Sequence, residues 1–220
     1  TWAELAEQLP YWDEVWSVDY LRLTHRLVYR WQIMRKIRQQ GFDIAIQPTF
    51  SRDFLTGDSV MRATGARERI GSIGDDSNSQ PWQKRVSDRW YTRLVPANPL
   101  PMMEIERNAE FVRLLGVNGH HAAVPFLPKV ATLPDALRIK NPYFIVFPGA
   151  SWSGKQWPAE SYVALVRNIH ASTGWQPVLC GSFEERRSCS MLSEQTSPPA
   201  LNLAGQTSLP QFAEVVRGAS

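Results

Sequence analysis

The sequence has few cysteines and no long hydrophobic run, and each absence excludes a class of protein. Cys180 and Cys189 are the only cysteines among 220 residues, which is too few for a disulfide framework, so a reducing compartment is expected. No apolar run approaches the ~18 residues that a membrane-spanning helix needs, and no signal peptide is visible. These features favour a protein without membrane spans or disulfide bonds.

An excess of charge of one sign is also absent. The chain carries 24 Lys and Arg residues against 21 Asp and Glu, a net charge of +3, and its arginines are scattered along the sequence. This distribution predicts no nucleic-acid-binding patch. Hydrophobic residues make up 43% and charged residues 20%, an ordinary composition for a soluble globular protein. The sequence lacks an initiating methionine and begins in a helical pattern, so we expect an internal piece of a longer protein.

The most informative stretch is residues 143–161, which read YFIVFPGASWSGKQWPAES. Its aromatic and β-branched start, 143–147, predicts a buried strand, and Pro148 and Gly149 end it. Small residues follow, and apolar residues at helical spacing then predict a helix over 159–171. The stretch therefore reads as a strand, a loop of small residues, a lysine and a helix.

This order of elements suits the binding of a diphosphate. Backbone N–H groups of the loop and the start of the helix can point at an anion, the hydroxyls of Ser151 and Ser153 can donate to it, and Lys155 adds a positive charge. The GxxxxGK[ST] pattern is absent, so this is not a Walker loop. An ordinary strand-to-helix turn with a solvated lysine remains the alternative.

Two more strands follow, at 174–181 and 201–205, and a last helix begins after Ser208. Gly181 ends the first of these strands, and Glu184 and Glu185 come directly after it. Such carboxylates either favour the start of the next helix or bond the diol of a ribose, as acidic residues do at strand ends of nucleotide-binding folds.

The first half of the chain shows the same alternation. Arg52 and Asp53 follow the strand predicted at 42–46, and ligands of open α/β sheets bind at the carboxyl ends of strands, so both are site candidates. The alternative is an Asp53 that caps the next helix beside a surface Arg52. The other elements expected here are a turn and short strand at 11–18, helices at 21–40, 54–64 and 104–115, a short strand after 65–71, a mobile surface loop at 71–88, an extended segment at 89–101, and a linker at 122–142.

No metal site is predicted. Asp75 and Asp76 lie in a loop that matches no calcium motif, and His120 and His121 have no carboxylate or cysteine at a useful spacing. Exposed loop histidines are the better interpretation.

Several segments together resemble the bacterial heptosyltransferase family, the ADP-heptose:lipopolysaccharide type of glycosyltransferase. FPGASWSGKQWPAESYVALV, VLCGSFEER and LNLAGQTSLPQFAEVV resemble its C-terminal half in this order, and LPYWDEVWSVD, GFDIAIQPTFSRD and TGARERIG resemble its N-terminal domain. The resemblance covers most of the chain and implies an α/β, GT-B-like fold truncated at both ends. Residues 1–140 would be a partial acceptor-side Rossmann-like domain with a linker, and 141–220 a partial nucleotide-sugar-binding Rossmann-like domain.

The resemblance also implies a reaction. It is the inverting, metal-independent transfer of a heptose or related sugar from an ADP-sugar to a phosphorylated glycolipid of the lipopolysaccharide type, with ADP-heptose as co-substrate and no cofactor. A cytoplasmic enzyme with at most peripheral contact to the inner membrane is expected. A GT-B transferase with a UDP- or GDP-sugar donor, and a non-catalytic nucleotide- or sugar-binding module, remain alternatives.

The implied site residues follow the family motif. Lys155 would contact the donor diphosphate and Ser151 would help to hold it, with Glu184 or Glu185 at the ribose and Arg52 facing the acceptor. The expected donor-binding set is Gly149, Ser151, Ser153, Lys155, Gly181, Glu184 and Glu185, and the expected acceptor-binding pair is Arg52 and Asp53. The family's general-base aspartate is expected before Thr1 and its Asp-Thr/Ser-Gly-x-x-His loop after Ser220, so this piece alone is expected to be inactive.

Overall fold

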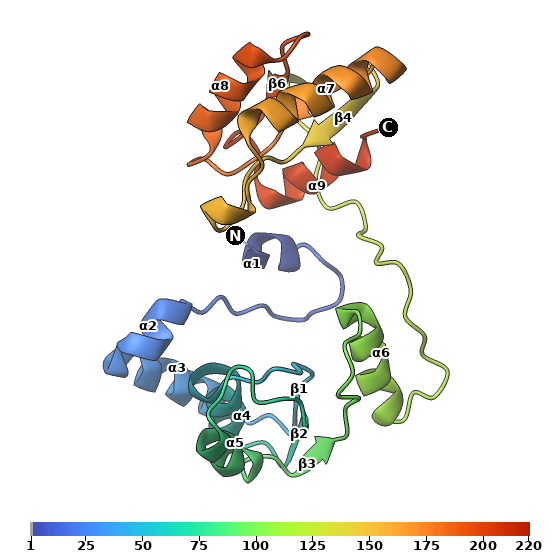
Figure 1. The fold of residues 1–220 in the computed structure, drawn as a ribbon. Coiled ribbons are helices and arrows are strands. Elements are labelled where there is room, and N and C mark those ends of the chain that lie inside the picture. Colours follow the sequence, from blue (N-terminus) through green and yellow to red (C-terminus); the bar gives the residue numbers. More distant parts are fainter. Residues whose placement is uncertain (1) are drawn as a thin grey trace. The chain divides into compact units, whose positions relative to one another are not determined.

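The computed structural model describes residues 2–220, apart from the side chain of Ser153. Its contacts divide the chain into two compact units (Figure 1). One unit is Ser17–Pro125, and the other is Phe126–Ser220 together with the residues up to Trp16. Each unit contains a three-stranded parallel sheet with helices, so the α/β class is confirmed. These units differ from the predicted ranges 1–140 and 141–220 at the linker and at the N-terminal residues, and the roles of the two domains stay predictions.

The unit Ser17–Pro125 is built on a parallel sheet in the order β1-β2-β3, with Ile46 opposite Ile70 and Ile70 opposite Arg93. Ile70, Val95 and Phe111 form its buried core cluster, so helix α6 is held to the sheet by an aromatic side chain. Its elements are α2 (Tyr20–His25), α3 (Leu27–Gln39), β1 (Ile44–Gln47), a π-helical turn (Phe54–Asp58), α4 (Ser59–Thr64), β2 (Glu68–Ser72), α5 (Pro81–Asp88), β3 (Arg93–Val95) and α6 (Glu104–Leu114).

The second unit is built on the parallel sheet β4-β5-β6. Its elements are α1 (Trp2–Ala6), a 3₁₀ turn (Asp135–Leu137), β4 (Tyr143–Val146), a 3₁₀ turn (Ser153–Lys155), α7 (Ala159–Thr173), β5 (Gln176–Leu179), α8 (Arg186–Gln195), β6 (Leu201–Asn202) and α9 (Leu209–Arg217). The predicted strands and helices of this half are therefore confirmed, with small shifts at their ends.

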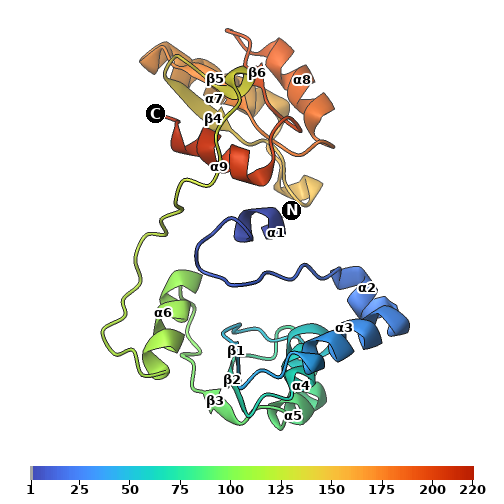
Figure 2. The ribbon, with the colours of Figure 1, turned by 180° about the vertical axis from the view of Figure 1, so that it is seen from behind.

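Helices cover both faces of this second sheet, which explains its continuous apolar strands. Successive side chains point to opposite faces, so Phe144 and Leu179 lie in one core with α7 and α8, whereas Tyr143 and Val178 lie in another with α9 (Figure 1 and Figure 2). Ser208 accepts a hydrogen bond from the Gln211 N–H at 3.3 Å and caps α9, as predicted.

Three predictions for the first half need correction. Among the described residues, 11–18 form no strand, and neither sheet includes this segment. The helix expected at 21–40 is two helices, because Arg26 adopts an extended conformation (φ −117°, ψ 99°) between them. The loop expected at 71–88 ends in helix α5, because Pro81 occupies its first turn and the Gln83 side chain accepts from the Gln80 N–H at 2.8 Å.

Among the described residues, no helix is both long and apolar enough to cross a membrane. Cys180 and Cys189 are free and buried. Burial raises the pKa of Cys180 to about 11, so its thiol stays protonated near neutral pH.

Candidate functional site

The loops that follow β4 and β5 meet at one edge of the second sheet. The two strands are parallel neighbours, with Val146 opposite Leu179, so both loops leave the sheet at its carboxyl end. In open α/β folds this edge is where ligands bind. The predicted donor residues all belong to these two loops.

Glu185 fills the space between the two loops. A Cβ atom added to Gly149 would lie 1.6 Å from its Oε1, and one added to Gly181 would lie 2.9 Å from its Oε2. The carboxylate also accepts a hydrogen bond from the Ser182 N–H at 2.6 Å. The two glycines therefore leave room for this carboxylate, which explains their presence at the ends of the strands.

The neighbouring carboxylate, Glu184, does not lie beside the two glycines. It is exposed, and hydrogen bonds from its own backbone N–H and from the Ser182 side chain lower its pKa. The sequence left the choice between Glu184 and Glu185 open, and in the structure it is the Glu185 carboxylate that lies beside Gly149 and Gly181. The binding roles assigned to both residues stay predictions.

A pocket of about 180 Å³ opens beside Glu185. The ring of Trp157 lies 5.7 Å from that of Tyr162, whose hydroxyl donates to the Pro148 carbonyl at 3.3 Å. An aromatic wall with one carboxylate suits a ligand that has both an apolar face and hydroxyl groups. The lining residues are Pro148, Gly149, Gln156, Trp157, Ala159, Tyr162, Glu185, Ser188 and Leu192.

Lys155 ends the one-turn helix Ser153–Lys155, in which its N–H donates to the Trp152 carbonyl at 2.9 Å. Its side chain is exposed, and no described carboxylate forms an ion pair with it. Ser151 is exposed as well, whereas the side chain of Ser153 lies outside the described residues. The loop therefore presents an unpaired cation to solvent, as a diphosphate contact would require.

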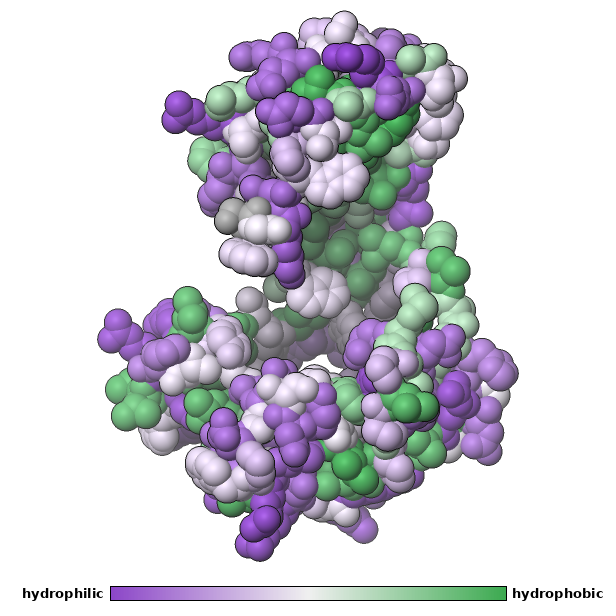
Figure 3. Space-filling view, in the orientation of Figure 1, coloured by the Kyte–Doolittle hydropathy of each residue, from purple (hydrophilic) through white to green (hydrophobic). Residues whose placement is uncertain are grey.

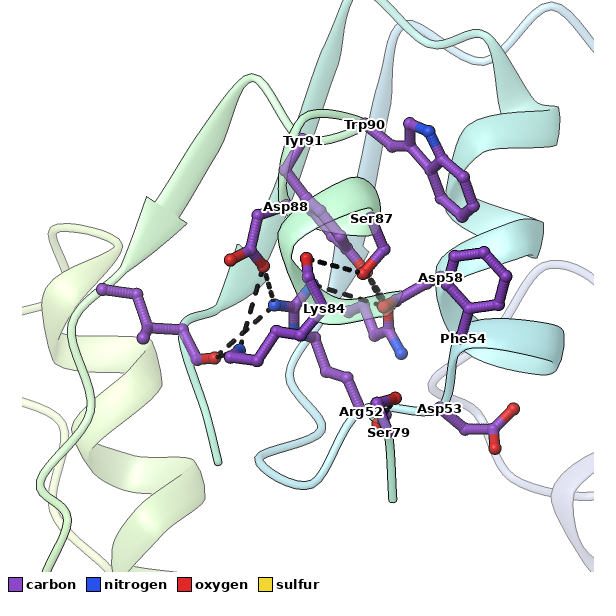
Figure 4. A network of polar contacts seen from close by, with 12 residues as sticks. Arg52, Asp53, Phe54, Asp58, Ser79, Lys84, Ser87, Asp88, Trp90 and Tyr91 are labelled. Carbon is purple, nitrogen blue, oxygen red and sulfur yellow. Dashed lines mark hydrogen bonds and ion pairs between the residues drawn. The ribbon is translucent and has the colours of Figure 1, made fainter. Parts of the chain in front are cut away.

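The predicted acceptor pair, Arg52 and Asp53, lies in the other unit. Both side chains already contact protein groups, and Figure 4 shows the partners of Arg52. The side chain of Arg52 is only 2% exposed, and its guanidinium contacts Asp58 Oδ1 at 3.3 Å and forms a second ion pair with Asp88. Tyr91 packs its ring 4.7 Å from the same guanidinium and donates its hydroxyl to Asp58 at 2.6 Å. Arg52, Asp58, Asp88 and Tyr91 are called the Arg52 network below.

Burial lowers the pKa of Arg52, but the hydrogen bond to Asp88 and the charge of Asp58 outweigh it and raise the pKa overall. The guanidinium thus stays charged, and only its Nε has no hydrogen-bond partner among the described residues. Asp53 accepts from the Thr56 N–H at 2.8 Å and caps the π-helical turn, which confirms the Asp53 part of the alternative interpretation. The other part, a surface Arg52, is wrong, because the folded sheet buries that side chain against Asp58 and Asp88. Contact of either residue with an acceptor stays a prediction, and for Arg52 it would require the network to open.

No cluster of three or more His, Cys, Asp or Glu side chains in the described part of the chain is arranged to hold a metal ion. His120 and His121 are exposed in a loop, as expected.

The sequence model of Glycosyltransferase family 9 (heptosyltransferase) matches residues 30–220. The chain belongs to this family. Its resemblance to the heptosyltransferases is therefore confirmed. No curated relative matches the sequence.

Solved structures agree on the fold. The E. coli heptosyltransferase WaaC with ADP-2-deoxy-2-fluoro heptose matches 99% of this chain and 68% of its own, at 18% identity and a TM-score of 0.71. E. coli ADP-heptose lps heptosyltransferase II matches with 99% and 65% coverage, 17% identity and a TM-score of 0.60. A family 9 glycosyl transferase from Veillonella parvula matches 98% of this chain and 62% of its own, at 15% identity and a TM-score of 0.64. The GT-B-like fold is thereby confirmed, and the chain spans about two thirds of the length of these relatives.

Sequence reasoning missed the aromatic wall of the pocket and the partners of Arg52. Trp157 stood inside the Lys-x-Trp-Pro segment that carried the resemblance, so that signal was available. No sequence pattern indicated the partners of Arg52. Two of them, Asp88 and Tyr91, are distant in sequence and contact Arg52 only in the folded sheet.

Proposed function

We propose that the full-length protein is a glycosyltransferase that moves a heptose, or a related sugar, from ADP-heptose to a phosphorylated glycolipid of the lipopolysaccharide type. The placement of the Glu185 carboxylate between Gly149 and Gly181, in a chain of family 9, is the observation that supports it. The solved WaaC structures that share the fold hold ADP and an ADP-2-deoxy-2-fluoro heptose, which favours the same class of donor here.

In this proposal the pocket beside Glu185 receives the nucleoside part of the donor. The Glu185 carboxylate accepts hydrogen bonds from the ribose hydroxyls, and the rings of Trp157 and Tyr162 give the flat base an apolar surface. The loop of small residues after β4 would hold the diphosphate next to Lys155 and Ser151.

The reaction is proposed to be inverting. An acceptor hydroxyl attacks the anomeric carbon, the bond from that carbon to the diphosphate oxygen breaks, and ADP leaves with the bonding electrons. Negative charge develops on the diphosphate, and Lys155, loop hydroxyls and backbone N–H groups stabilise it without a metal or cofactor. The aspartate that takes the acceptor proton is expected outside the present chain.

We further propose that the protein works in the cytoplasm and reaches its glycolipid acceptor by peripheral contact with the inner membrane. Arg52 and Asp53 remain the proposed acceptor residues, although both contact protein groups in this structure.

The identity of the donor base is tested by competition. Binding of ADP, UDP and GDP to the full-length protein is measured by calorimetry, and ADP is expected to bind most tightly. Preferential binding of UDP or GDP would assign a different donor, and a failure of all three nucleotides to bind would contradict the proposal.

Lys155→Ala tests the role of the loop lysine. The variant is expected to lose about 10²- to 10³-fold in kcat, because a positive charge next to the leaving group acts mainly in the transition state. Lys140→Ala is the matched control, since Lys140 is another exposed lysine of the same unit. Transfer by Lys155→Ala at the rate of Lys140→Ala would remove Lys155 from the mechanism.

A further inference from the structure

A groove with a volume of about 480 Å³ lies between helices α3 and α4, within the unit Ser17–Pro125. Arginine and tryptophan dominate its lining: Arg30, Trp31, Arg35, Arg38, Arg62 and Trp90. The positions 31, 35 and 38 are separated by four and three residues, so they share one side of α3. The groove is therefore a continuous basic and aromatic surface, separate from the pocket beside Glu185.

The cationic groups of this groove have no acidic partners. None of its four arginines forms an ion pair with a described carboxylate, and no acidic side chain lines it. Instead, the guanidinium of Arg35 lies 5.2 Å from the ring of Trp31, and that of Arg62 lies 4.9 Å from the ring of Trp90. Cations that rest on aromatic rings keep most of their hydrogen-bond donors free for an external anion.

Exposed apolar side chains continue the surface toward the start of α3. Leu27 is 82% exposed, Val28 70% and Trp31 59%. In the space-filling view, hydrophobic and strongly hydrophilic side chains lie next to one another over α2 and the start of α3 (Figure 3). A helix with large aliphatic residues, tryptophan and arginine on its exposed side has the composition of an interfacial helix.

We propose that the α3–α4 groove, together with Leu27 and Val28, docks on the surface of a bilayer that contains anionic phospholipids. The lipid phosphates would pair with the guanidinium groups of Arg35, Arg38 and Arg62, whereas Arg30 already donates to the Leu23 and Leu55 carbonyls. Trp31 would lie at headgroup level, and the two aliphatic side chains would enter the acyl boundary. A nucleic acid would satisfy the arginines but would leave Leu27 and Val28 in water, so a membrane fits both features. The inference rests on the proposed peripheral contact with a membrane and assigns that contact to one surface. Vesicle binding is measured without donor or acceptor, so its failure is distinguishable from a failure of the proposed sugar transfer.

The test is co-sedimentation of the full-length protein with vesicles of phosphatidylcholine, alone or with about 30% phosphatidylglycerol. The native protein is expected to bind the anionic vesicles, with affinity falling as salt rises, and to bind the neutral ones weakly. Arg35→Glu with Arg38→Glu should weaken binding at least about 25-fold, since each basic residue near an anionic surface contributes about fivefold. Leu27→Ser with Val28→Ser should weaken it about tenfold at unchanged charge.

The matched control is Arg67→Glu with Arg167→Glu, two exposed arginines outside the groove whose replacement changes the net charge equally. This control should bind like the native protein, and circular dichroism should show all variants to be folded. Equal losses in the control and groove variants would reduce the effect to net charge and overturn the proposal. So would equal binding to both vesicle types, no binding to either, or a groove variant that loses binding to a single-stranded oligonucleotide but keeps binding to vesicles.

Discussion

At the scale of single residues, Gly149 matters through the side chain that it lacks. The Glu185 carboxylate occupies the position that a Cβ at residue 149 would take, at 1.6 Å. Gly149 does not adopt a positive φ, so the requirement for glycine comes from the carboxylate and not from backbone strain. Alanine at this position would therefore displace the Glu185 carboxylate in the pocket without straining the backbone at residue 149.

Gly149→Ala is expected to move the flexible end of Glu185 and weaken ADP binding about tenfold, the worth of one hydrogen bond to a charged group. The thermal midpoint should change little. Calorimetry with ADP measures the effect, and Gly119→Ala is the control, because a Cβ there meets nothing within 4 Å. Unchanged ADP binding would mean that Glu185 does not contact the nucleotide.

The residue scale also shows where sequence reasoning ended. The strand, the loop of small residues and Lys155 were readable because they are consecutive and each follows from local chemistry. The choice between Glu184 and Glu185 was not readable, because it depends on Gly149, which reaches Glu185 only when β4 and β5 pair. Burial of Arg52 was hidden for the same reason, since its partner Asp88 lies 36 residues away.

At the scale of elements, the apolar runs predicted β1 and the strands of the second sheet, but also a strand at 11–18 that does not form, and the break between α2 and α3 was not predicted. No glycine or proline marks the break at Arg26, and arginine is a good helix former. After the break, Arg30 of α3 donates a long-range hydrogen bond to the Leu55 carbonyl, whereas the start of α2 is capped locally by Asp19, which accepts from the Arg22 N–H at 2.9 Å. Tertiary contacts of this kind override local propensity.

The Arg52 network joins elements that are distant in sequence, so its disruption should cost stability. Asp58→Asn leaves the buried guanidinium with one carboxylate fewer, and we expect the free energy of unfolding to fall by about 3 kcal/mol. Urea denaturation measures it. Glu104→Gln is the control, because Glu104 is an exposed partner of Arg107 at 3.9 Å and its loss should cost about 0.5 kcal/mol or less. Equal costs for the two variants would contradict a structural role for the network.

At the scale of the whole molecule, the chain passes between its two units twice, at Trp16–Ser17 and at Pro125–Phe126. Neither passage lies in a helix or strand, and Val124 is 91% exposed. Beyond the second passage the chain is anchored again, because the Val130 N–H donates to Glu214 at 3.1 Å. Residues 11–14 and most of 120–126 are exposed, so the chain near both passages is accessible to a protease.

Limited digestion of the full-length protein with a non-specific protease should therefore cut these residues first near 11–18 and 117–125. The early products should include a central fragment that holds β1–β3 and a later fragment that starts before β4 and holds β4–β6. Both should resist cleavage because their strands are hydrogen-bonded into sheets. Mass spectrometry over the time course identifies the cuts, and the same digestion in urea serves as the unfolded control. Early cuts inside either sheet would contradict this order of cleavage, because an opening confined to the passages exposes no strand to the protease.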